Sequence, residues 1–221
     1  MTLHTVSDTR RQVLHRRIRL IVAVTISYNI IEAIIAITAG TVASSAALVG
    51  FGLDSTIEVL SAVAVAWQFT RRDPERWERP TLRVIAVAFF ALAVYVTATS
   101  VAALVAGVDV QHSTVGIVLT AVSVVVMPFL SYAQRRTGRE VGSASAVADS
   151  KQTLVCHLSA AVLVGLVVNS TLGWSGADSI AALVIAAFAV REGVEAWKGD
   201  ACATSVGMIL EDDHETDGHP Q

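Results

Sequence analysis

The chain is short of charge, of aromatic side chains and of cysteine. Only 16% of its 221 residues are charged and 6% are aromatic, and its two cysteines, Cys156 and Cys202, lie far apart. This spacing predicts neither a disulfide framework nor a CxxC zinc motif. The sequence contains neither HExxH nor GxSxG, and residues 50–54 do not match the usual signature of an intramembrane aspartyl protease. We therefore do not expect an enzyme.

Long segments also lack any positive charge. No Lys or Arg occurs in residues 20–70, 84–134 or 152–190. Hydrophobic residues make up 53% of the chain, and the mean hydropathy is +0.60. A soluble domain rarely has this composition, whereas a polytopic membrane protein usually does. Residues 1–19 are polar and basic and lack the pattern of a secretory signal.

The spacing of the basic groups predicts the topology. A spanning helix needs about 20 residues, so each of the two longer gaps fits two helices and a turn. We predict an all-α, multi-pass protein of the cell membrane with six transmembrane helices, and the positive-inside rule places both termini in the cytoplasm. The predicted parts are a basic N-terminal segment (1–19), a six-helix transmembrane domain (20–198) and a short acidic, disordered tail (199–221). The spans are expected at about 20–40, 43–69, 84–107, 114–134, 144–169 and 174–194.

The second predicted span carries two acids, Asp54 and Glu58. An ionised carboxylate at the centre of a membrane helix costs roughly 2.5–3.5 kcal/mol on insertion scales, so such residues usually mark an ion or proton path. Their i, i+4 spacing puts both on one helix face, together with Gly50 and Ser61. Two acids one turn apart repel unless a cation or a proton separates them, which indicates a cation site. The alternative is a pair of hydrogen-bonded acids, or one protonated acid that aids packing.

The fifth predicted span has a second polar face. Asp149, Gln152 and Cys156 share it, and His157 lies at its edge. These residues make a plausible half of a metal site. Cys156 alone could equally be a small core residue, and His157 alone a buried structural histidine.

Two further acids lie in predicted spans. Glu32, with Tyr28 and Asn29 one turn before it, is a candidate for lining the same cavity or for moving protons. A packing acid satisfied by Tyr28 and Asn29 is the alternative. Asp178 stands in a first helical turn, where an acid suits the helix dipole, so we expect it to be structural.

These residues resemble the cation diffusion facilitator (cation efflux) family, whose members export zinc, cadmium, cobalt, iron and manganese. The family's second span carries a pattern like A-D-A-x-H-S-x-x-D-x-L-S, and its fifth a pattern like A-D-A-x-H-x-x-x-D-x-L-S. Here ALVGFGLDSTIEVLSAVAV is similar to the second span, ADSKQTLVCHLSA to the fifth and DSIAALVIAAFAVREGVEAW to the sixth. The chain also resembles a compact bacterial branch whose fifth span reads A-D-S-x-Q-T.

The resemblance implies a cation site between the second and fifth spans. It places Asp54 and Glu58 on the ligand positions of the second span, and Gln152 and Cys156 on those of the fifth. The usual C-terminal cytoplasmic domain, which dimerises in the family, is not expected, because only residues 199–221 follow the last span.

One departure concerns the ligand set. No His stands at an expected ligand position, and Gln152 is a poor ligand, so Asp149 or His157 is a candidate to replace it. Oxygen ligands with the Cys156 thiolate suit Zn²⁺, with Cd²⁺ and Co²⁺ next.

The resemblance implies efflux of a divalent cation in exchange for protons, because the ligands must lose protons to hold the ion. The expected partners are divalent cations, protons, the lipid membrane and a second copy of the chain in a homodimer, with no resident cofactor and no nucleic acid. Two other classes stay open. One is a membrane protein that binds zinc as a regulator without transporting it. The other is a proton-coupled exporter of organic cations.

Overall fold

The computed structural model describes residues 8–69, 74–141, 152–174 and 176–198, and within these ranges all regular secondary structure is helical. This confirms the all-α prediction for the described residues. The six helices are α1 (Asp8–Ala43), α2 (Ala46–Phe69), α3 (Pro74–Ala106), α4 (Thr114–Val141), α5 (Gln152–Leu172) and α6 (Gly176–Lys198).

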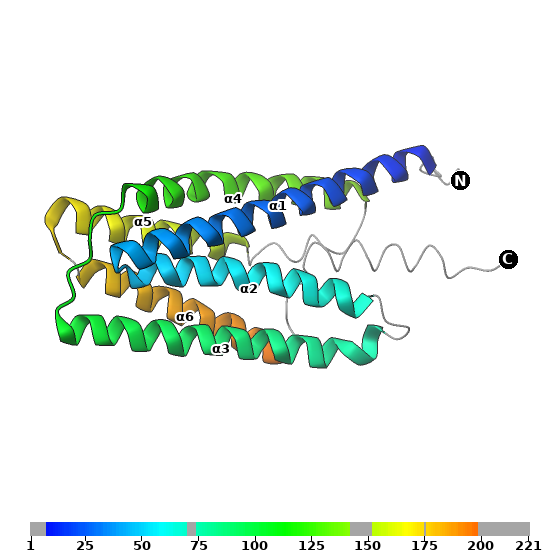
Figure 1. The fold of residues 1–221 in the computed structure, drawn as a ribbon. Helices are drawn as coiled ribbons and strands as arrows, with labels where there is room; N and C mark the ends of the chain where they lie inside the picture. The colour runs from blue at the N-terminus through cyan, green and yellow to red at the C-terminus, as the bar shows by residue number, and fades with distance from the viewer. Residues whose placement is uncertain (1–7, 70–73, 142–151, 175, 199–221) are drawn as a thin grey trace.

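The helices form an elongated antiparallel bundle in which α1 begins and α6 ends toward the same end (Figure 1). α2 lies at its centre, in contact with α1, α3, α5 and α6. α1 also packs on α4, α4 on α5, and α6 on both α3 and α5. The helix that carries Asp54 and Glu58 is therefore enclosed by neighbours that can add side chains to a site.

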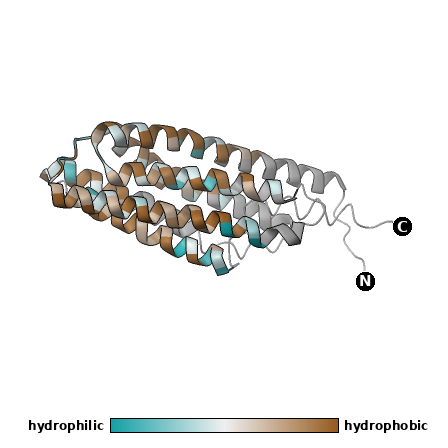
Figure 2. Cartoon of the chain, turned by 60° about the horizontal axis from the view of Figure 1, so that its bottom comes forward, coloured by the Kyte–Doolittle hydropathy of each residue, from teal (hydrophilic) through white to brown (hydrophobic). Residues whose placement is uncertain are grey.

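The bundle exposes an apolar surface along its length. Val94, Val105 and Phe129 are 69%, 84% and 70% exposed, and hydrophobic residues dominate the sides of the helices (Figure 2). Contiguous apolar surface of this kind is unusual on a soluble monomer and suits contact with lipid. By length and composition, two described segments, Ala23–Ala43 and Arg79–Ala106, could cross a membrane, while Thr114–Leu130 and Ala160–Leu172 are shorter apolar helices. The full set of six spans stays a prediction.

Two helices begin earlier than expected. α1 begins at Asp8, inside the segment predicted to precede the first span, and α3 begins at Pro74, about ten residues before the predicted span. Proline suits a first helical position because its φ is already helical and its missing N–H has no partner there. The helices thus extend beyond their apolar parts. The predicted tail (199–221) and the first residues of the predicted fifth span lie outside the described residues.

A tight turn joins α1 to α2. Ser44 adopts a left-handed conformation with φ of 56°, and the amide of Ser45 donates to the Gly40 carbonyl at 2.9 Å. Ser45 then caps α2, because its Oγ accepts a hydrogen bond from the Leu48 amide at 3.0 Å. The two helices therefore leave the turn in a defined register.

Asp178 ties α6 to the same turn. The side chain is 1% exposed and accepts hydrogen bonds from the Ser45 hydroxyl and, at 3.3 Å, from the Ala47 amide. A carboxylate at this point satisfies amides that the first turn of α2 leaves without helical partners. This geometry fits the expected structural role of Asp178 and extends it to the start of a second helix.

The connection from α3 to α4 crosses the same end of the bundle (Figure 1). The Gln111 amide donates to the Ala43 carbonyl at 2.9 Å, at the end of α1. Asn169 of α5 donates its Nδ2 to the Val110 carbonyl at 3.0 Å. Residues 107–113 therefore link α1, by a backbone hydrogen bond, to α5, by the side chain of Asn169.

Small residues bring α1 and α2 close together. A Cβ added at Gly52 would lie 2.7 Å from Ile37 Cγ1 and 2.9 Å from the Ile37 backbone nitrogen. One added at Gly40 would lie 2.7 Å from the backbone nitrogen of Val49. Such backbone approach is a common basis of helix association in membranes, where lipid removes most of the hydrophobic driving force.

We expect Gly52→Ala to destabilise the bundle by about 1–3 kcal/mol, because the new methyl group would press on the α1 backbone. Unfolding of the purified protein in detergent would measure the loss. Val63→Leu is the matched control, because Val63 lies on the same helix with 57% of its surface exposed. Equal stability of the two variants would show that the approach of α1 to α2 is not tight.

Candidate metal-binding site

Asp54 and Glu58 lie one turn apart on α2, as predicted, and both are half-buried. Between them Ser55 is buried, with its hydroxyl oxygen 3.2 Å from the Phe51 carbonyl oxygen of its own helix. The pair is thus rigidly mounted on the central helix but remains partly accessible.

Two residues of α1 face this part of α2. Asn29 is 5% exposed and donates its Nδ2 to Glu58 Oε2 at 2.8 Å. Glu32, one turn later, is 1% exposed and accepts a hydrogen bond from Ser55 at 2.9 Å. The antiparallel packing of α1 and α2 produces both contacts.

Glu32 also reaches α4. Its second carboxylate oxygen accepts a hydrogen bond from Ser123, and the Ser123 oxygen lies 2.7 Å from the Tyr28 hydroxyl. Because the single hydroxyl proton of Ser123 points to Glu32, Tyr28 is the donor in the second contact. Tyr28, Ser123 and Glu32 therefore form a hydrogen-bonded chain. This arrangement satisfies Glu32 well and confirms its closeness to Tyr28, while Asn29 pairs with Glu58 instead.

Sequence reasoning missed one acid of this region, Glu192 on α6. It is close enough to act electrostatically on both Asp54 and Glu58, as is Glu32. Glu192 follows Arg191 in a segment that reads as a charged cytoplasmic end. Its position one turn after the buried Ala189 was the signal that could have placed it inside.

The α5 half of the predicted site cannot be joined to this geometry. Asp149 lies outside the described residues, and so do the side chains of Gln152, Cys156 and His157, although α5 begins at Gln152 and contacts α2. Among the residues that the structure describes, no three His, Cys, Asp or Glu side chains come close enough to hold a metal ion. A complete metal shell therefore needs ligands beyond the described acids.

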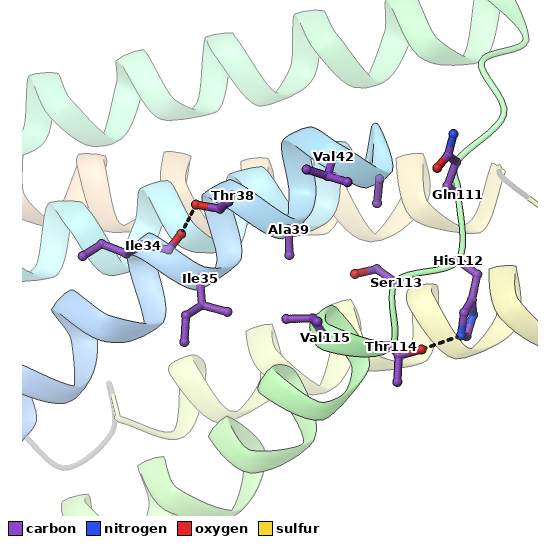
Figure 3. Close-up of a pocket in the computed structure, with 11 residues that line it drawn as sticks. Ile34, Ile35, Thr38, Ala39, Val42, Gln111, His112, Ser113, Thr114 and Val115 are labelled. Carbon is purple, nitrogen blue, oxygen red and sulfur yellow. Dashed lines mark hydrogen bonds between the residues drawn. The ribbon is translucent and has the colours of Figure 1, made fainter.

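A surface hollow of about 630 Å³ lies elsewhere, between α1 and the start of α4 (Figure 3). Ile34, Ile35 and Val115 give it an apolar wall, and no acid lines it. Its single imidazole, His112, is engaged by Ser170 at 2.6 Å and by Thr114 at 3.0 Å. The hollow is therefore not the predicted cation site.

The comparison with known families decides the identity. The family model of the cation efflux transmembrane domain matches residues 22–199. The chain belongs to the cation efflux family. No curated protein matches it. Membership confirms the resemblance and supports a membrane protein that transports metal cations.

Family membership changes the meaning of the acids. In a cation efflux domain, the half-buried Asp54 and Glu58 are candidates for holding a cation, whereas Glu32 is enclosed and accepts hydroxyl donors from α2 and α4. The two kinds of acid should respond differently to mutation.

We expect Ser123→Ala to destabilise the protein by about 1–2 kcal/mol, because it removes hydrogen-bond partners from both Tyr28 and Glu32 in a buried site. Denaturation in detergent would measure this. Ser27→Ala is the control, because the exposed Ser27 hydroxyl bonds only to the Ala23 carbonyl of its own helix, at 2.8 Å. A Ser123→Ala protein as stable as the control would mean that the Glu32 chain contributes nothing to folding.

Proposed function

We propose that this cation efflux protein exports a divalent transition-metal cation in exchange for protons, with Zn²⁺ the first candidate and Cd²⁺ and Co²⁺ next. The site we propose lies between α2 and α5, near the middle of the membrane. The supporting observation is the pair Asp54 and Glu58, half-buried on the central helix of the bundle.

Charge supports a divalent cation. Asp54 and Glu58 repel each other at one-turn spacing, and Glu32 and Glu192 add negative potential at both. A double positive charge offsets this repulsion more effectively than a single one. The acids alone do not complete a metal shell, so α5, which contacts α2, must supply the rest.

The α5 ligands that we propose are Cys156 with one of Asp149 or His157, and Gln152 as the weaker alternative. A thiolate beside two carboxylates favours Zn²⁺ and its neighbours over Mg²⁺ or Ca²⁺, which prefer oxygen alone.

Protons take the place of the ion. When the cation leaves, protonation relieves the repulsion between the carboxylates, so cation and protons compete for one site. We propose the Tyr28–Ser123–Glu32 chain as part of the proton path, because it reaches the side of α2 that carries Ser55, next to Asp54. Rocking of the helix bundle would give alternating access, with both termini in the cytoplasm. A homodimer stays a prediction from the family.

The direct test is Zn²⁺ and Co²⁺ flux into proteoliposomes under a proton gradient. We expect Asp54→Asn to abolish gradient-driven flux while the protein still inserts and folds, because the change removes charge but not shape. Asp109→Asn is the matched control, because Asp109 is exposed in the connection between α3 and α4. Normal flux in Asp54→Asn would refute the site. Wild-type Zn²⁺ binding without flux would point to a zinc-binding regulator. Flux of an organic cation in place of metal would point to a proton-coupled exporter of organic cations.

A second test places Cys156 without measuring transport. In a Cys202→Ser background, Cys156 is the single thiol. We expect Zn²⁺ to slow its alkylation by a maleimide, because a metal-bound thiolate is a poor nucleophile. Glu58→Gln in the same background should remove the protection. Alkylation at the same rate with and without Zn²⁺ would exclude Cys156 as a ligand.

A further inference from the structure

The carboxamide of Asn29 is only half satisfied. Its nitrogen donates to Glu58 Oε2, but its oxygen, Oδ1, is buried and has no hydrogen-bond partner among the described residues. The residue is 5% exposed, so little water can reach that oxygen. A buried polar atom without a partner is uncommon in a folded protein and calls for a physical reason.

A second unsatisfied atom lies next to the same acid. The hydroxyl oxygen of Ser61, almost one turn after Glu58 on α2, is also buried without a partner among the described residues. Asn29 is thus hydrogen-bonded to Glu58 from α1, and Ser61 follows Glu58 on α2 by three residues. Each buried oxygen without a partner costs free energy unless a donor group or a cation satisfies it at some stage.

On this basis we propose that Asn29 is a ligand of the transported cation, contributing Oδ1 from α1 to the site of Asp54 and Glu58. The inference rests on the proposed function and extends the site from two helices to three. Without a cation, the Asn29 amide group holds Glu58 by donating to it. With a cation at Glu58, the same carboxamide offers its oxygen after a rotation of the side chain.

A neutral oxygen ligand has two consequences. It adds a donor atom without adding negative charge to a site that already holds two carboxylates and the proposed thiolate. It is also a hard ligand, which favours Co²⁺ over the softer Cd²⁺, whereas the thiolate proposed on α5 favours Cd²⁺. Asn29 is thus expected to set the preference between these ions.

The test is the ratio of Co²⁺ flux to Cd²⁺ flux in proteoliposomes. We expect Asn29→Ala to lower this ratio about tenfold, the lower end of the effect of perturbing a metal's ligand environment. Asn29→Asp should keep the ratio, because it retains an oxygen in the same place. Ser27→Ala, a nearby change on an exposed side chain, should leave both fluxes unchanged.

The opposite pattern would overturn the proposal. If Asn29 only positions Glu58 through its N–H, then Asn29→Asp also loses that donor, and both variants reduce the two fluxes by the same factor. Should Asn29→Ala not fold, the visible absorption of Co²⁺ bound to an Asn29→Leu variant decides, because Leu has a similar shape and carries no oxygen, and a spectrum identical to wild type would exclude Asn29 as a ligand.

Failure of the wider function gives a different result. Absence of metal flux in wild type would refute the transport proposal and this inference with it. Flux that Asp54→Asn abolishes, with an unchanged Co²⁺ to Cd²⁺ ratio in Asn29→Ala, would refute the role of Asn29 alone.

Discussion

The close approach of α1 to α2 is the constraint on which the rest of the structure depends. Gly40 and Gly52 remove the side chains that would hold the helices apart, and the turn at Ser44 starts them in register. Each later contact along the hairpin follows from that start, first Glu32 with Ser55 and then Asn29 with Glu58. In lipid, burying apolar surface between helices gains little free energy. The close packing of the two backbones therefore fixes the position of the acids.

The acids of this region differ in how fully their carboxylates are hydrogen-bonded, and this difference indicates different roles. Glu32 is enclosed and receives hydroxyl donors from α2 and α4, so it can hold three helices together. Asp54 and Glu58 are half-buried, and each feels the charge of Glu192 across the bundle. Acids kept partly open and mutually repelling cost stability, which is the usual signature of a site built for a ligand rather than for folding.

The helices and the shared face of the two acids could be predicted from the sequence. The contacts between helices could not, because they depend on tertiary packing. Gaps without Lys or Arg that are too long for one helix predict the helix count, and i, i+4 spacing predicts the shared face of Asp54 and Glu58. Periodicity identifies a face but not its neighbour, so the partner of Asn29, the cap that Asp178 provides and the position of Glu192 depend on tertiary packing. The fifth-span ligands stay predictions, because their side chains lie outside the described residues.

The connection between α3 and α4 holds several helices together at the end of the bundle that it crosses. There, the Val110 carbonyl accepts from the Asn169 side chain of α5, the Gln111 amide donates to the end of α1, and Asp178 fastens α6 to the start of α2. A movement that parts these helices there must break hydrogen bonds at several points together, so it should be an all-or-none event. The amide hydrogen of Gln111 would then exchange with solvent only in molecules whose helices have parted at this end, so its exchange rate would report how often this end opens.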